Sequence, residues 1–134
     1  SVPGGTVSLL GTDDAHIHRD RLGAPAASWG HAGVLHLGVT HAPYTRVVSA
    51  LASAGSDLIL AGHTHGGQIG IPGGGAIITN CDIARRYAKG LNRWEAPDGA
   101  QSWLHVSAGL GTSPYAKIRI ATRPEASIIH VHPA

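Results

Sequence analysis

Hydrophobic side chains form short runs along most of this chain, and three of the runs follow one another closely. Residues 34–39 and 58–61 are apolar runs of strand length, and residues 44–54 between them carry small and apolar side chains at helical spacing. Gly55 and Asp57 are residue types that end a helix and form a turn. The pattern predicts a strand, a helix and a second strand.

The rest of the pattern favours β-structure. Residues 7–10 form an early apolar run, whereas residues 70–75 and 95–99 carry turn-forming residues and should be exposed connections. Four later segments are rich in β-forming residues and are bounded by glycine or proline, as strands usually are. These segments are residues 76–79, 103–107, 117–121 and 127–131. We therefore expect an α/β (α+β) chain in which helix is the minority.

Histidines follow two of the predicted strands. His41 comes after the first strand and directly precedes the Ala-Pro pair, while His63 and His65 follow the second strand in a glycine-rich loop. A strand-helix-strand unit makes its two strands parallel neighbours, so both carboxyl ends reach the sheet edge where open α/β sheets place ligands. An extended backbone turns residues i and i+2 the same way, so His63 and His65 would face one cation or two neighbouring ones. The pattern predicts a metal site that contains all three histidines.

The order of these motifs resembles a known family. Thr-His-Ala-Pro at residues 40–43 precedes the predicted helix, and Leu-Ala-Gly-His-Thr-His-Gly-Gly-Gln at residues 60–68 follows it. Together they resemble the last two metal motifs of the calcineurin-like metallophosphoesterases. Four other segments resemble, in order, the C-terminal half of a bacterial branch of that family. They are residues 11–14, 88–91, 106–113 and 123–125.

The resemblance implies a fold and a chemistry. Two sheets of the family fold pack face to face with helices outside, so residues 1–134 would be a single domain that forms the β-rich C-terminal portion of such a β-sandwich. Two divalent cations would hold a hydroxide that attacks the phosphorus of a phosphomonoester or phosphodiester. Imidazole and carboxylate ligands admit manganese, iron or zinc, and we expect manganese or iron. The substrate would be a small-molecule or lipid-linked phosphoester, which no residue pattern identifies further.

The resemblance also implies residue roles. His41 and His63 would bind one metal, and His65 would bind the other. Three more residues would orient the ligands, shape the loop or face the substrate, because a ligand histidine needs a partner on its other nitrogen. They are Thr64, Gln68 and Asn80. The Arg85–Arg86 pair suits phosphate by its planar guanidinium groups, but a solvated face explains it better.

The first three motifs of the family, an Asp-x-His, a Gly-Asp-x-x-Asp or Asn and a Gly-Asn-His-Asp or Glu, do not precede these segments. They would supply the bridging aspartate, the remaining ligands and the histidine that protonates the leaving group. Three ligands cannot hold two metals, so we expect at most one metal on this chain alone and no activity of the isolated chain. Half a sandwich exposes an apolar face, so the partner would be the missing N-terminal half or another copy of the chain.

Asp14-Ala15-His16 spells the first motif, but outside the expected context. In the family that motif opens the domain, whereas here it leads within about 30 residues to the late motifs. We favour a polar connector over residues 11–21, with aspartates that cap a turn, which leaves Asp14 and His16 at most on the rim of the site. His130 and His132 repeat the spacing of His63 and His65 near the C-terminus, where an idle surface pair is the simpler interpretation.

The composition of the chain argues against several other classes of protein. A chain of 134 residues that is 43% hydrophobic can build one domain with a modest core. Only 13% of residues are charged and the net charge is +2, which argues against nucleic acid as a partner. No stretch resembles a membrane span or a signal peptide, so a cytoplasmic location and attachment through a missing N-terminal segment both stay open. The single cysteine, Cys81, excludes an internal disulfide.

Two functions from different classes remain. The first is a metallophosphoesterase, of which this chain is the C-terminal part. The second is a non-catalytic half-domain that associates with itself and binds at most one metal through His41, His63 and His65. Sequence upstream of Ser1 would discriminate between them, because only the enzyme requires the three early motifs.

Overall fold

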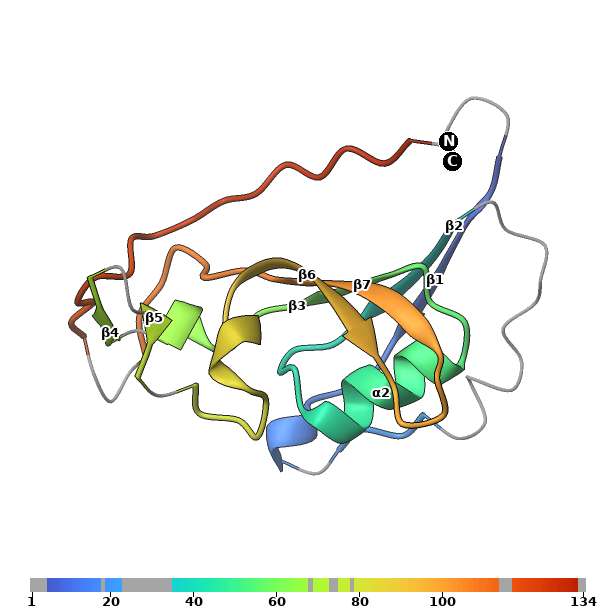
Figure 1. The fold of residues 1–134 in the computed structure, drawn as a ribbon, viewed down its shortest axis with the longest axis horizontal. Coiled ribbons are helices and arrows are strands. Elements are labelled where there is room, and N and C mark those ends of the chain that lie inside the picture. The colour runs from blue at the N-terminus through green and yellow to red at the C-terminus, as the bar shows by residue number, and fades with distance from the viewer. Residues whose placement is uncertain are drawn as a thin grey trace.

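A five-stranded mixed sheet is the largest element of this computed structural model (Figure 1). The structure describes residues 5–17, 19–22, 35–67, 69–72, 75–77, 79–113 and 117–132. The sheet has the order β1-β2-β3-β7-β6, with β6 antiparallel to β7 and the other four strands parallel to one another. Its strands are β1 (Val7–Gly11), β2 (Leu35–Val39), β3 (Leu58–Ala61), β6 (Gly90–Glu95) and β7 (Gln101–Val106).

Helix α2 (Thr45–Ser53) lies against one face of the sheet (Figure 1). Its first N–H groups have no cap from the preceding residue, but Asp82 Oδ1 accepts the Thr45 N–H at 2.7 Å and satisfies one of them. Burial of each large aliphatic side chain at the contact contributes about 1.5–3 kcal/mol. The fully buried side chains there are Val47, Val48, Leu51, Ile59, Leu104 and Val106.

The glycine inside β2 is explained by how closely α2 and its flanking loop approach. A Cβ atom on Gly38 would stand 2.8 Å from Ser56 Oγ and 3.3 Å from a methyl group of Leu51. Ser56 is itself fixed, since its hydroxyl donates to the Leu51 carbonyl at 2.7 Å. A side chain at Gly38 would therefore push the helix away from the sheet.

The opposite face of the sheet carries a row of apolar side chains. The strand register pairs Leu9 with Leu37, Leu37 with Leu58, and Leu58 with Trp103, and neighbours in register lie on the same face. Leu9 is 68% exposed and Trp103 is 39% exposed. Arg93 covers part of Trp103, with its guanidinium carbon 4.0 Å from the ring centroid. Leu58 in the same row is buried, so the described residues form a sheet with one covered apolar face and one that is open in part.

Smaller elements connect the strands beyond the sheet. They are the 3₁₀ turns η1 (Ala15–Ile17), η2 (His65–Gly67) and η3 (Arg85–Tyr87) and the paired strands β4 (Gly70–Ile71) and β5 (Gly75–Ala76). Residues 120–132 follow as an extended segment that runs apart from the sheet, drawn in red in Figure 1. Over the described ranges, no helix has the length and apolar character needed to cross a membrane.

The predicted strand-helix-strand unit and the early strand are confirmed, and with them the mixed α/β class. Strand β7 is confirmed two residues ahead of its predicted start, and Gly99 closes the predicted turn by donating its N–H to the Ala96 carbonyl. Of the described residues in the predicted strand at 76–79, only Ala76 lies in a strand, and Ile78 is outside the described residues.

Three expectations were wrong. Strand β6 was not predicted, because its alternating exposed and part-buried residues gain a strand only by pairing with β7. Residues 117–121 contribute a single bridge, Ile120 to Ile69, and residues 127–131 form no strand. Residues 117–121 bond to their neighbours only through Ile120, whose carbonyl accepts the Gly70 N–H at 2.9 Å. Residues 127–131 have strand-forming side chains but pair with no strand among the described residues, and Ile128 is 87% exposed.

Candidate functional site

Three parallel strands deliver the histidines to one edge of the sheet. In the strand register Gly11 at the end of β1 pairs with Val39 at the end of β2, and Val39 pairs with Leu60 in β3. The chain continues from these ends into the segments that hold His16, His41 and His63, respectively. The parallel strands therefore bring these three segments together at the carboxyl edge of the sheet, as expected.

His41 and His63 are in direct contact. His63 Nδ1 lies 3.0 Å from His41 Nε2, and the ring centroids are 4.8 Å apart at 69°. Two hydrogen bonds between main chains hold the loops together, from Gly62 N to the His41 carbonyl and from Thr40 N to the Leu60 carbonyl, both at 3.0 Å. The two rings share a hydrogen bond. Its length is also close to the separation of about 3 Å between two nitrogens that bind one cation at about 2.0–2.1 Å and at a right angle.

A third imidazole lies beside this pair. The His16 ring stands 4.8 Å from the His63 ring, and His16 Nδ1 lies 2.9 Å from the Tyr44 hydroxyl. Asp14 Oδ1 accepts the His16 N–H at 2.8 Å, and Asp13 Oδ1 accepts the Asp14 N–H at 2.7 Å. The connector with turn-capping aspartates is thus present as predicted, and it places His16 on the rim of the site.

The backbone around His63 and His65 differs from the extended conformation assumed from the sequence. Their φ angles are 65° and 50°, in the left-handed region, and the alternation that would turn both rings the same way does not apply. His65 instead lies near Arg119, whose guanidinium donates to the His65 carbonyl at 3.4 Å. The structure brings the rings of His41, His63 and His16 together, while the His65 side chain hydrogen-bonds to the main chain of Gly111 and stays close enough to His41 to interact with it electrostatically.

The environment of His63 and His65 favours the neutral imidazole, the form that binds metals. Burial lowers the pKa of His63 below its ordinary value of 6.5, and the nearby His41 and His16 lower it further. Burial also lowers the pKa of His65, with Arg119 adding to the effect. His63 Nε2 is buried and has no hydrogen-bond partner among the described residues.

Glycine is required in the loop after His65. Gly66 has a φ of 66°, and a Cβ atom there would stand 2.6 Å from a Thr122 methyl group and 3.0 Å from Ala108 Cβ. The missing side chain of Gly66 therefore lets the main chain approach its neighbours closely. This packing joins the loop to the segment that follows β7.

Thr64 shapes the same loop. Its buried hydroxyl donates to the Ala88 carbonyl at 2.7 Å and accepts the Gly66 N–H at 3.2 Å. Asn80 is exposed with a φ of 55°. This turn conformation is enough to explain an asparagine at the position, so no contact with a substrate is needed to explain it. Gln68 lies outside the described residues. Of these three candidates, Thr64 has the predicted loop-shaping contacts.

Arg119 is a residue that sequence reasoning missed. Its guanidinium donates to the carbonyls of Ala108 at 2.8 Å and Gly109 at 3.0 Å, and also to that of Gly111. It thereby fixes the loop after β7 against the His65 turn. No local pattern marks such a residue, because its partners are main-chain carbonyls about ten positions earlier.

Within the described ranges, no three histidine, cysteine, aspartate or glutamate side chains are arranged so that they could hold a metal ion as they stand. The site offers two converging nitrogens, with His16 and Asp14 beside them. No family model, no curated protein and no solved structure matches this chain.

Proposed function

We propose that this chain forms part of the metal centre of a metal-dependent phosphoesterase of the calcineurin-like type. The observation that carries the proposal is the 3.0 Å separation between His63 Nδ1 and His41 Nε2 at the carboxyl edge of a parallel sheet. Neutral imidazoles suit divalent manganese, iron and zinc, and these two would share one cation. His65 would bind a second cation, which rests on the family resemblance alone.

The residues of the chain fit such a centre. When bound, a pair of cations supplies a hydroxide nucleophile and neutralises the phosphoryl oxygens. His41 and His63 would hold their positions through the main-chain bonds between their loops, and the Tyr44 hydroxyl orients the His16 ring. The buried, unpartnered His63 Nε2 supports a site that a further bound group completes.

Two cations need more ligands than three histidines provide. The open apolar face, with Leu9 and Trp103 exposed, supports a second sheet as the source of the rest. That sheet would come from an N-terminal half of the same polypeptide or from a second copy of this chain. The complete fold would then be the β-sandwich flanked by helices, acting on a small-molecule or lipid-linked phosphoester.

Elemental analysis of the purified chain, coupled to hydrolysis of an aryl phosphodiester with added manganese, tests the proposal. We expect at most one metal per chain, lost in His63→Ala, and no turnover by the chain alone. A longer product of the same gene with the early motifs should hold two metals and turn over. Failure of the wild-type chain to bind metal, or full retention of metal by His63→Ala, would contradict the proposal.

The alternative is a non-catalytic half-domain that associates with itself and binds one metal. The direct contact of His41 with His63 favours it, because a single cation between these two residues does not need His65. Inactivity of the longer product with its metals bound would support this alternative. About two metals with turnover by the 134-residue chain would instead mean that Asp14, His16 or a second copy completes the site.

A further inference from the structure

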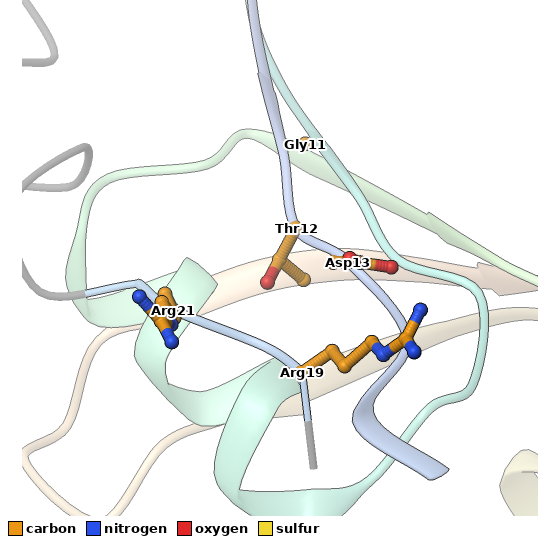
Figure 2. Close-up of a pocket in the computed structure, with 5 residues that line it drawn as sticks. All are labelled: Gly11, Thr12, Asp13, Arg19 and Arg21. Carbon is orange, nitrogen blue, oxygen red and sulfur yellow. The ribbon is translucent and has the colours of Figure 1, made fainter. Parts of the chain in front are cut away.

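A cavity of about 560 Å³ opens beside the histidine site (Figure 2). It is lined by Gly11 at the end of β1 and by Thr12, Asp13, Arg19 and Arg21 of the connector that follows. Figure 2 shows Arg19 and Arg21 on opposite sides of Thr12, with Asp13 on the Arg19 side. Two cationic side chains and one anionic side chain therefore line this cavity, with the Arg19 guanidinium extending to the side away from Arg21.

The two arginines have unused hydrogen-bonding capacity. Neither guanidinium group has a hydrogen bond or an ion pair to the part of the chain that the structure describes. The carboxylate between them in the sequence, Asp20, is bound on both oxygens by Arg46. Arg19 and Arg21 thus keep their donors for a group from outside, and planar guanidinium groups match the oxygens of phosphate.

One hydroxyl group in the wall of the cavity also lacks a hydrogen-bond partner among the described residues. Thr12 Oγ1 is shielded from solvent and has no hydrogen bond among the described residues, although buried hydroxyl groups usually have one. The main chain of Thr12 is fixed, since its N–H donates to the Val39 carbonyl at 3.0 Å. Asp13 uses Oδ1 to accept the Asp14 N–H, which leaves its other oxygen for a hydroxyl group of a ligand.

The segment that lines the cavity also carries His16 of the histidine cluster. Asp14 and His16 lie between Asp13 and Arg19 in the chain, and the Arg19 N–H donates to the Asp14 carbonyl at 3.1 Å. The His16 ring reaches His63 from this same turn. A ligand with one end at the histidines could therefore place its other end in the cavity.

We propose that Arg19, Arg21 and Thr12 form a subsite for a second phosphate group of the substrate. The substrate would then be a diphosphate or a bisphosphate, in which one phosphoryl group lies at the histidine site and the other in the cavity. This inference rests on the proposed function for the reaction, but the subsite itself requires no metal.

The test is the binding of inorganic pyrophosphate to the metal-free 134-residue chain in the presence of a chelator, measured by isothermal titration calorimetry. Arg19→Gln and Arg21→Gln should each weaken binding about tenfold or more, because each removes a charged hydrogen-bond donor. Arg85→Gln removes an exposed arginine from η3 and is the matched control, with binding within about twofold of wild type. Circular dichroism verifies that all variants are folded.

Two results would overturn the subsite. One is the absence of binding by the wild-type chain at about 1 mM pyrophosphate. The other is equal weakening by Arg85→Gln, which would mean that only net charge matters. If pyrophosphate binds as expected but the wild-type chain takes up no metal, the phosphoesterase proposal fails and the subsite stands.

Discussion

The His-x-His spacing occurs twice in this chain, and the two copies have different surroundings. His63 and His65 follow β3, adopt left-handed backbone angles and lie beside His41 and Arg119. His130 and His132 are both exposed on the extended C-terminal segment, where their rings stack at 10° with centroids 6.5 Å apart. The exposed pair shows the side-by-side geometry that spacing alone gives. The half-buried pair, His63 and His65, has a different geometry because the surrounding packing fixes its backbone.

The conformation around His63 has an energetic cost that its neighbours must offset. A non-glycine residue in a sparsely populated backbone region costs on the order of 1–3 kcal/mol. The packing of Gly66, the hydrogen bonds of Thr64 and those of Arg119 hold the loop in place. Such an arrangement is expected at a site, whereas the C-terminal pair carries no comparable strain.

The largest expected effect is on the free energy of unfolding, through the core that supports His63 and His65 but not His130 and His132. Leu104 is fully buried between α2 and the sheet, so Leu104→Ala should lower the free energy of unfolding by about 2–5 kcal/mol. Ile128→Ala, beside the second pair and 87% exposed, should change it by less than about 0.5 kcal/mol. Urea denaturation of both variants measures the difference. Equal losses would mean that the C-terminal segment packs on the sheet in solution.

The next effect is on metal affinity. His41→Ala removes one of the two converging nitrogens and should weaken Co²⁺ binding by about 100-fold or more, since changes beyond the ligands already cost 10- to 100-fold. His132→Ala is the matched control at the exposed pair and should leave the affinity within about twofold. Titration followed by visible absorption measures both. A larger loss in His132→Ala than in His41→Ala would reverse our assignment.

A smaller effect on stability is expected at Arg119, which holds the loop after β7 in place. Arg119→Gln removes donors to the Ala108, Gly109 and Gly111 carbonyls and should destabilise the chain by about 1–3 kcal/mol. The pKa of His65 should rise toward its ordinary value, because the Arg119 charge lowers it, but burial should keep it below that value. NMR titration of the His65 ring measures this shift. Arg123→Gln, at an exposed arginine, is the control and should leave the His65 pKa unchanged.

The smallest effect is on the pH dependence of stability. Because burial, His41 and His16 lower the folded-state pKa of His63, the unfolded chain takes up its proton first as the pH falls below about 6.5. Stability should therefore decrease from pH 7 toward pH 5, and His63→Gln should reduce that slope. Urea denaturation at several pH values measures it. A slope that is the same in His63→Gln would exclude His63 as its source.

Local patterns were sufficient for the first half of the sheet and insufficient elsewhere. Strands β2 and β3 and helix α2 were predictable because each has a continuous apolar face in a single segment. Strand β6 depends on β7, and residues 127–131 have strand-forming side chains without a partner strand. Strand formation in both cases depends on neighbours that a local pattern does not contain.

The same limit applies to the site. His41 and His63 were predictable because parallel strands end at the same edge. The contact of His16 with His63 and the hydrogen bonds of Arg119 depend on turns. The direction of these turns cannot be predicted from the periodicity of the sequence. The backbone at His63 could not be inferred either, because the packing of Gly66 against Ala108 requires the fold to be known.

The most direct test of the central claim is a crystal of the chain grown with Co²⁺ and measured at the cobalt absorption edge. We predict an anomalous peak about 2.1 Å from both His41 Nε2 and His63 Nδ1, in place of the hydrogen bond between them. A peak only at His130 and His132, or none at His41 and His63, would contradict the account.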